Sequence, residues 1–208
     1  MFAERVAWAV SRDVGKRALE IVREVAHDMD GSGGLIRAFS GAHRQKPDRL
    51  LFLTFWKGWE DLSRYLAGRR SAAFDELIRL HSVERPKPEH FEVVWGSNGE
   101  VIDTVRGDWL WSFDDFLTRP PEGERLLECL GGLAPDLRHH SSFAGAGLWL
   151  DRINPGHLVL SGLWQPDAPE SACTGWAAPL AGRLPPDTQH KQSLYKLLVA
   201  DPVRLAVP

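Results

Sequence analysis

The chain has 208 residues, a formal net charge of −3 at pH 7, and 43% hydrophobic and 25% charged residues. This composition is typical of a globular protein, and the small net charge provides no general attraction to nucleic acid or to an anionic membrane surface. The two cysteines, Cys129 and Cys173, are far apart. A disulfide framework is therefore not expected, and we expect a cytoplasmic protein that binds neither nucleic acid nor membrane.

The first hundred residues alternate between the periodicities of strands and helices. Glu4 and Arg5 interrupt the apolar N-terminal stretch, so it is not a signal peptide. Strand patterns cover residues 2–10, 35–45, 49–56 and 90–95, and helical patterns cover residues 11–29, 59–66 and 71–80. A glycine-rich turn at 30–34 and the proline-rich break RPKP at 85–88 separate these segments. The order strand, helix, strand, strand, helix, strand is that of a ferredoxin-like split βαβ unit.

The second half repeats this order. Strand patterns cover residues 108–117, 141–152, 157–164 and 192–200, and weaker helical patterns cover residues 123–133 and 170–182. FSGA at 39–42 recurs as FAGA at 143–146, and each is followed by a strand that ends in tryptophan, at Trp56 and Trp164. We therefore predict an internal duplication with units at 1–97 and 106–203, joined by a linker or connecting hairpin at 98–105.

The segment FWKGWEDLSRYLAGRRSAAFDELI (55–78) carries a family resemblance. It resembles the antibiotic biosynthesis monooxygenase (ABM) domain, and the resemblance is best over residues 1–95. It implies an α+β fold of the dimeric α+β barrel superfamily. Two tandem units in one chain would pair their antiparallel sheets into a pseudo-dimeric barrel, because the bare sheet face of each unit must be covered. Such a chain would be a monomeric pseudo-dimer or would associate further as a homodimer.

The resemblance leaves the function open among three alternatives. The first is a cofactor-independent monooxygenase that oxidises a small aromatic or polyketide-like phenol with O2 in an aromatic-lined barrel cavity. The second is a non-catalytic ligand-binding or stress-related module that kept the fold. The third is a heme-degrading monooxygenase. The sequence does not establish that the chain is an enzyme at all.

Heme is the disfavoured cofactor. The heme-degrading relatives place a tryptophan, an iron-binding histidine and an asparagine where this chain has Tyr65, Asp75 and Val6. A carboxylate at position 75 does not supply the imidazole nitrogen that such an iron takes. The neighbouring His139 and His140 have no cysteine or carboxylate cluster around them, so no metal site is predicted. We expect no cofactor.

Candidate site residues follow from the strand faces and from the resemblance. The candidate catalytic residues are Tyr65, Arg37 and His81. The candidate pocket residues are Trp56, His43, Phe74, Trp149, Trp164 and Trp176. Structural roles remain open for several of them: a strand-end core anchor for Trp56, a solvated side chain for His43, and a helix C-terminal cap for His81.

Overall fold

The protein is described by a computed structural model. It covers residues 1–10, 20, 24–25, 29, 33–68, 87–96, 104–119, 125–129, 141–178 and 183–201. The contacts divide the chain into two compact units. Unit 1 is Met1–His90 with Leu197–Pro208, and unit 2 is Phe91–Lys196.

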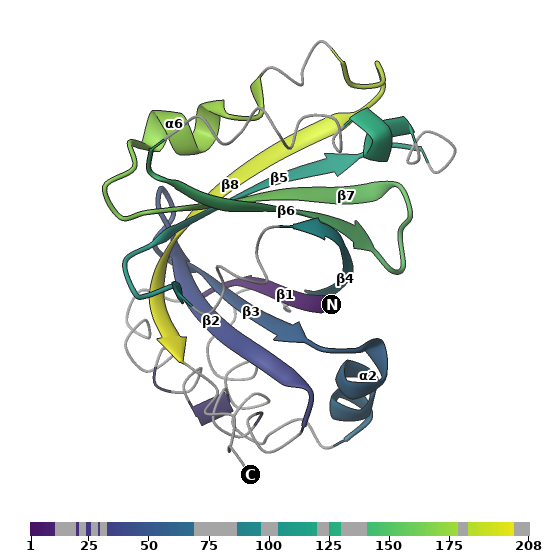
Figure 1. Ribbon diagram of the computed structural model, residues 1–208, viewed down its shortest axis with the longest axis vertical. Coiled ribbons are helices and arrows are strands. Elements are labelled where there is room, and N and C mark those ends of the chain that lie inside the picture. Colours follow the sequence, from purple (N-terminus) through teal and green to yellow (C-terminus); the bar gives the residue numbers. More distant parts are fainter. Residues whose placement is uncertain are drawn as a thin grey trace. The chain divides into compact units, whose positions relative to one another are not determined.

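Unit 1 is a four-stranded sheet with a helix beside it (Figure 1). Its elements are β1 (Phe2–Ala9), β2 (Leu35–His43), β3 (Arg49–Trp56), α2 (Trp59–Ala67) and the first part of β4 (Lys87–Gly96). The central strand β3 pairs antiparallel with both β1 and β2. The order of strands in this sheet is β4-β1-β3-β2.

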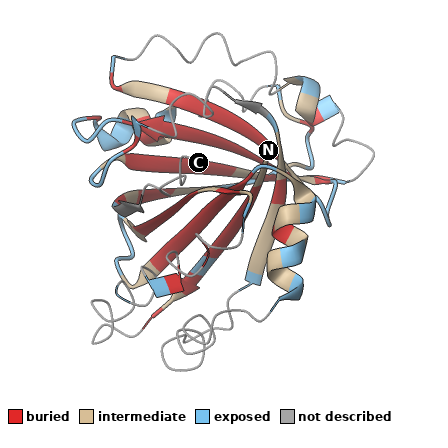
Figure 2. Ribbon diagram, turned by 60° about the horizontal axis from the view of Figure 1, so that its bottom comes forward, coloured by how far each residue is buried: buried red, intermediate tan, exposed pale blue. Residues whose placement is uncertain are grey.

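The sequence explains why β3 is central. Every residue from Leu50 to Trp56 is buried, as expected for a strand that is covered on both faces. In contrast, α2 buries Leu62 and exposes Glu60, so one side of the helix packs on the sheet and the other faces solvent (Figure 2). Acidic residues in its first turn, including Glu60, interact favourably with the helix dipole.

Unit 2 has the same arrangement. Its elements are β5 (Leu110–Leu117), β6 (Phe143–Asp151), β7 (His157–Trp164), α6 (Glu170–Gly175) and β8 (Gln189–Asp201). The strand β5 pairs antiparallel with β7 and β8, β6 pairs with β7, and the second part of β4 pairs with β6. The order of its own strands is β8-β5-β7-β6, which repeats the order of unit 1.

The predicted fold class is confirmed. The full strand order, β1-β3-β2-β8-β5-β7-β6-β4, is that of a closed barrel, and each half has the ferredoxin-like order. The two units also share the same strand register. Phe2 at the start of β1 pairs with Trp56 at the end of β3, and Leu110 at the start of β5 pairs with Trp164 at the end of β7. One boundary differs from the prediction: β4 begins at Lys87, inside the proline-rich segment RPKP (85–88), and not at residue 90. The exact domain limits remain a prediction, since β4 and β8 each run from one unit into the other.

In the part of the chain that the structure describes, no helix combines the length and the apolar character needed to span a bilayer.

Candidate functional site

The two faces of the unit 2 sheet carry different side chains, and the strand β5 shows this best. Leu110 clusters with Cys173 of α6, and Phe116 clusters with Ala177, which follows that helix. Because side chains alternate along a strand, Asp114 lies between them on the same, helix-covered face. Sequence alone therefore places a carboxylate in a row of core positions.

Asp114 is held by two side chains of the neighbouring strand β8. Its Oδ1 lies 2.8 Å from His190 Nε2 and also accepts a 2.8 Å hydrogen bond from Gln192 Nε2. The carboxylate side chain is completely buried, whereas the His190 side chain is 38% exposed. The pair therefore connects a buried acid to solvent through an imidazole.

The electrostatics of this pair follow from its burial. Desolvation raises the pKa of Asp114 above its ordinary value, and this effect is opposed by the interactions with His190, Trp176 and Gln192. The hydrogen bond to Asp114 raises the pKa of His190, and the partial burial of the imidazole opposes it. The pKa of each group is thus shifted by burial and by a specific partner, as is typical of residues that act as acids and bases.

Aromatic rings surround the pair. The His190 ring stacks on Phe116, with 4.8 Å between centroids and 8° between planes. The Trp176 indole lies 6.0 Å from the Trp164 ring and 6.0 Å from the Phe143 ring. We call Asp114, His190, Gln192 and Trp176 the unit 2 polar site.

Gly162 of β7 allows Trp176 to lie against the sheet. A Cβ at this position would lie 3.0 Å from Trp176 Cζ2 and 2.8 Å from Ser112 Oγ. Ser112 in turn accepts a 3.0 Å hydrogen bond from Trp164 Nε1. A larger residue at 162 would therefore displace the indole or break that hydrogen bond.

Unit 1 has no equivalent of Asp114. Counted from the strand-end tryptophans, Trp56 and Trp164, the position of Asp114 in unit 2 corresponds to Val6 in unit 1. Val6 is 1% exposed and belongs to the apolar cluster under α2. The duplication has therefore diverged at this position, with an apolar residue in one copy and an acid in the other.

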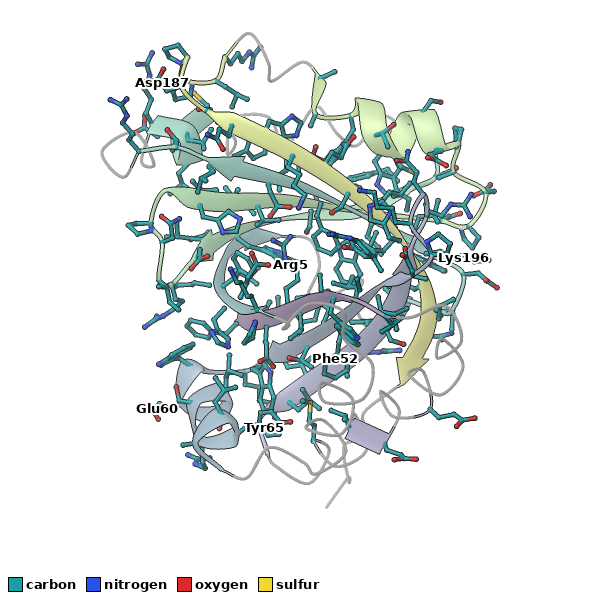
Figure 3. All side chains as sticks on the ribbon, turned by 180° about the vertical axis from the view of Figure 1, so that it is seen from behind. Arg5, Phe52, Glu60, Tyr65, Asp187 and Lys196 are labelled. Atoms are coloured by element: carbon teal, nitrogen blue, oxygen red, sulfur yellow. The ribbon has the colours of Figure 1, made fainter. Side chains whose placement is uncertain are left out.

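The structure brings two of the predicted unit 1 residues together. The rings of Trp56 and Tyr65 lie 5.2 Å apart at 31°. Trp56 is fully buried and donates a 2.9 Å hydrogen bond from Nε1 to Thr54 Oγ1. Tyr65 packs against the cluster that contains Trp56 and Phe52, whereas Glu60 on the same helix is exposed (Figure 3). This geometry suits a packing role for Trp56.

The other predicted residues of unit 1 lie elsewhere. Arg37 is 4% exposed, and its guanidinium lies 5.6 Å from the centre of the Phe39 ring. Its neighbour Ala38 belongs to the cluster that contains Tyr65, so Arg37 and Tyr65 are on opposite faces of the sheet. At the end of β2, His43 accepts a 3.1 Å hydrogen bond at Nδ1 from the Gln45 N–H.

Two of the predicted site residues, Phe74 and His81, are outside the described residues. The same holds for Asp75, the position at which the heme-degrading relatives carry their histidine.

The three predicted tryptophans of unit 2 divide between the two sheet faces. Trp164 and Trp176 lie together on the helix-covered face. Trp149 follows Leu148 of that face in β6 and therefore points to the opposite one. There its ring lies 5.8 Å from Phe91 and 5.5 Å from Phe113. One pocket lined by all three tryptophans is thus not formed within unit 2.

A second histidine of unit 2 lies on the same face as Trp149. His157 is 3.0 Å from Asp115 through Nε2 and 2.9 Å from Asp151 through Nδ1. Asp151 also accepts hydrogen bonds from the backbone N–H groups of Ile153 and Asn154 in the turn between β6 and β7. Both ring nitrogens of His157 are thus engaged, and the arrangement fixes the turn. No group of three or more metal-ligating side chains occurs among the described residues.

Sequence reasoning missed Asp114, His190 and Gln192. A signal for the first was present, because Asp114 continues the alternation Leu110, Ser112, Phe116 on a core face. No comparable signal existed for His190, since its pairing with Asp114 spans 76 positions and depends on the register of two strands.

No protein-family model matches the sequence, and no curated protein matches it significantly. Several solved structures share the fold over nearly the whole chain. A candidate monooxygenase from Fusobacterium nucleatum aligns with a TM-score of 0.71 at 10% identity, covering 97% of this chain and 94% of that one. An anthrone oxidase-like protein aligns with a TM-score of 0.66 at 11% identity (98% and 93%). A candidate chlorite dismutase aligns with a TM-score of 0.61 at 9% identity (96% of each). These likenesses show a common fold.

Proposed function

We propose that this chain, whose fold is the tandem ABM-like α+β barrel, is a cofactor-independent monooxygenase that acts on a small aromatic or polyketide-like phenol. The observation that carries the proposal is the buried Asp114 carboxyl, held by the half-exposed His190 among aromatic rings. An anthrone oxidase-like protein of the same fold supports this choice of chemistry. We assign the reaction to the unit 2 polar site, on the helix-covered face, in place of Tyr65 and Arg37, which lie on opposite faces of the unit 1 sheet.

The reaction needs a base, oxygen and an electron-rich ring. A phenol with a hydrogen on the ring carbon para to its hydroxyl would give its O–H proton to the Asp114–His190 pair. The para carbon of the resulting phenolate forms a bond to O2, and the terminal oxygen of the hydroperoxide takes the proton back. Loss of the para hydrogen as a proton and cleavage of the O–O bond then give a quinone and water. The phenol loses four electrons and O2 gains four, so no further oxidant is required.

Each group of the site has a part in this scheme. Burial of Asp114 makes its carboxylate a stronger base than an exposed one, because the pKa is raised. His190 holds the carboxyl in place through Oδ1, and its exposed part provides a path for the proton to solvent. The aromatic rings exclude water from the phenolate and leave the ring carbon free to meet oxygen.

The test measures oxygen uptake with anthrone and 1-naphthol as probes. We expect one O2 consumed per quinone formed, and a loss of about 10²-fold in rate for Asp114→Asn, as is typical when a general base is removed. The matched control is His90→Gln, because His90 pairs with Glu4 at 3.5 Å in unit 1 and lies outside the site. No uptake with any phenol, or an equal loss in the control, would exclude the proposal.

The rival proposal is a ligand-binding module without catalysis. One observation favours it: the rings of Phe143, Trp164 and Trp176 lie 5.0–6.0 Å from one another and would bind an aromatic molecule by ring contacts alone, without an acid or a base. Saturable quenching of tryptophan fluorescence by phenols, without oxygen uptake, would support this alternative.

A candidate chlorite dismutase shares the fold, so heme is the cofactor to test. The described residues of unit 2 do not fit it well. The two described histidines of this sheet are already engaged, His190 through Nε2 to Asp114 and His157 through both ring nitrogens, so an iron would have to compete with these carboxylates for an imidazole nitrogen. A hemin titration without a Soret shift would agree with this conclusion.

A further inference from the structure

The Asp114 carboxyl uses only one of its two oxygens. Oδ1 receives both hydrogen bonds from β8, through His190 and Gln192. Oδ2 is buried and has no hydrogen-bond partner within the described residues. A buried carboxylate oxygen normally has a partner, so an orphaned one indicates a missing group.

A matching donor lies beside it. The Nε1–H of Trp176 is also buried and has no hydrogen-bond partner in the described part of the chain. The indole N–H is directed at the Asp114 carboxyl and lowers its pKa as a donor, but the two groups do not reach full hydrogen-bond geometry with each other, and Gly162 is what allows the indole to lie there. An acceptor and a donor are therefore left open side by side.

The chemistry of this pair selects a hydroxyl. A hydroxyl oxygen donates its proton to the carboxylate and accepts the indole N–H at the same time. An ether or a ketone satisfies the indole alone, and an apolar ring satisfies neither group. The rings of Trp164 and Phe143, next to Trp176, favour a hydroxyl that is attached to a flat aromatic body.

We infer that Asp114 Oδ2 and Trp176 Nε1 bind the hydroxyl of an aromatic ligand, with Trp176 as the residue that selects a hydroxyl over its ether. The inference rests on the proposed function in that it names the ligand class of the same site. It assigns the acceptor of the phenolic proton to one oxygen of Asp114, and it gives Trp176 a binding role beyond packing.

Binding is measured without oxygen, by calorimetry, for 1-naphthol and its methyl ether, 1-methoxynaphthalene. We expect 1-naphthol to bind at least tenfold more tightly than the ether. In Trp176→Phe, which keeps an aromatic ring and removes the N–H, we expect about a tenfold loss for 1-naphthol and little change for the ether. The matched control is Trp8→Phe, which removes another buried indole N–H, in the apolar cluster of unit 1.

A second readout does not depend on the folding of a variant. The indole N–H resonances of the nine tryptophans are recorded by ¹⁵N NMR on the wild-type protein, and the Trp176 signal is assigned through its own backbone resonances. This signal should move downfield with 1-naphthol and stay in place with the ether. Equal affinities for the two ligands, no binding of 1-naphthol at millimolar concentration, or an unmoved Trp176 signal would overturn the inference.

The two proposals fail separately. Hydroxyl-selective binding without oxygen uptake under air would keep this inference and exclude the monooxygenase. Oxygen uptake without a binding preference for 1-naphthol over its methyl ether would keep the monooxygenase and exclude this inference.

Discussion

Asp114 and His190 form a hydrogen bond of 2.8 Å between adjacent strands, and the first side chain is wholly buried while the second is 38% exposed. Neither residue is near the other in sequence. Their pairing places a buried carboxyl on the helix-covered face of unit 2, between the core residues Leu110 and Phe116.

The stability of the protein should fall as the pH rises above neutrality. The pKa values of Asp114 and His190 are both raised in the folded state, above 3.8 and 6.5 respectively, so the native state binds more protons than the unfolded state over those windows. The stability from His190 is complete below pH 6.5 and is lost as the pH passes its raised pKa. Thermal unfolding between pH 6 and 9 measures this decline.

The Asp114→Asn variant is the control for this pH effect. It removes the main cause of the raised pKa of His190, so its unfolding temperature should vary less with pH above 6.5. An unchanged slope in this variant would show that another group causes the decline.

Replacing the buried acid by the residue of the other repeat should separate stability from function. Asp114→Val copies the Val6 environment and removes a desolvated carboxyl, so we expect the free energy of unfolding to be unchanged or higher by about 1 kcal/mol. Oxygen uptake should be abolished. Chemical denaturation and an oxygen electrode check both parts, and a loss of several kcal/mol would contradict the first.

Trp56 should be important for stability. It is fully buried at the end of β3, where it packs on Tyr65 and bonds to Thr54. Trp56→Ala should cost about 3–5 kcal/mol in the free energy of unfolding, as is typical for truncation of a buried aromatic residue. A urea titration measures this, and a cost below about 1 kcal/mol would argue against the anchor role.

Gly162→Ala should disturb the site by a steric effect. The added methyl group would lie 2.8 Å from Ser112 Oγ and 2.9 Å from Trp164 Nε1. We expect a loss of about 1–3 kcal/mol in stability, as for other overpacked positions, together with a shifted Trp176 environment. Near-ultraviolet circular dichroism reports the second effect. The exposed Gly175, where no atom would lie within 4 Å of an added Cβ, is the control position for an alanine.

The sequence predicted the elements because the strands have strong patterns. RLLFLTFW at 49–56 and HLVLSGLW at 157–164 became β3 and β7 with the same limits. The repeat of FSGA as FAGA correctly indicated two units with one strand order. In these segments local periodicity and burial agree, so little depends on distant contacts.

The unit 2 polar site could not be predicted from the periodicity of the sequence, because it depends on which strands pair and in which register. Alternation places Asp114 on the core face, yet only the pairing of β5 with β8, where Asp114 is opposite Gln192, brings His190 to it. The resemblance in residues 55–78 indicated Tyr65, and strand alternation indicated Arg37, both in unit 1. It could not show that unit 2 has the acid in place of Val6, because the second copy carries little of that motif.

The covalent fusion of the two repeats has an evolutionary consequence. In an assembly of two identical subunits, every substitution is made twice, so a costly acid buried in one sheet would also be buried in its copy. In a fused chain the codons for Val6 and Asp114 mutate independently. One repeat can then keep a well-packed core and supply stability, while the other accumulates the desolvated and unpaired groups that chemistry requires. Selection on the two halves is thereby separated within a single gene.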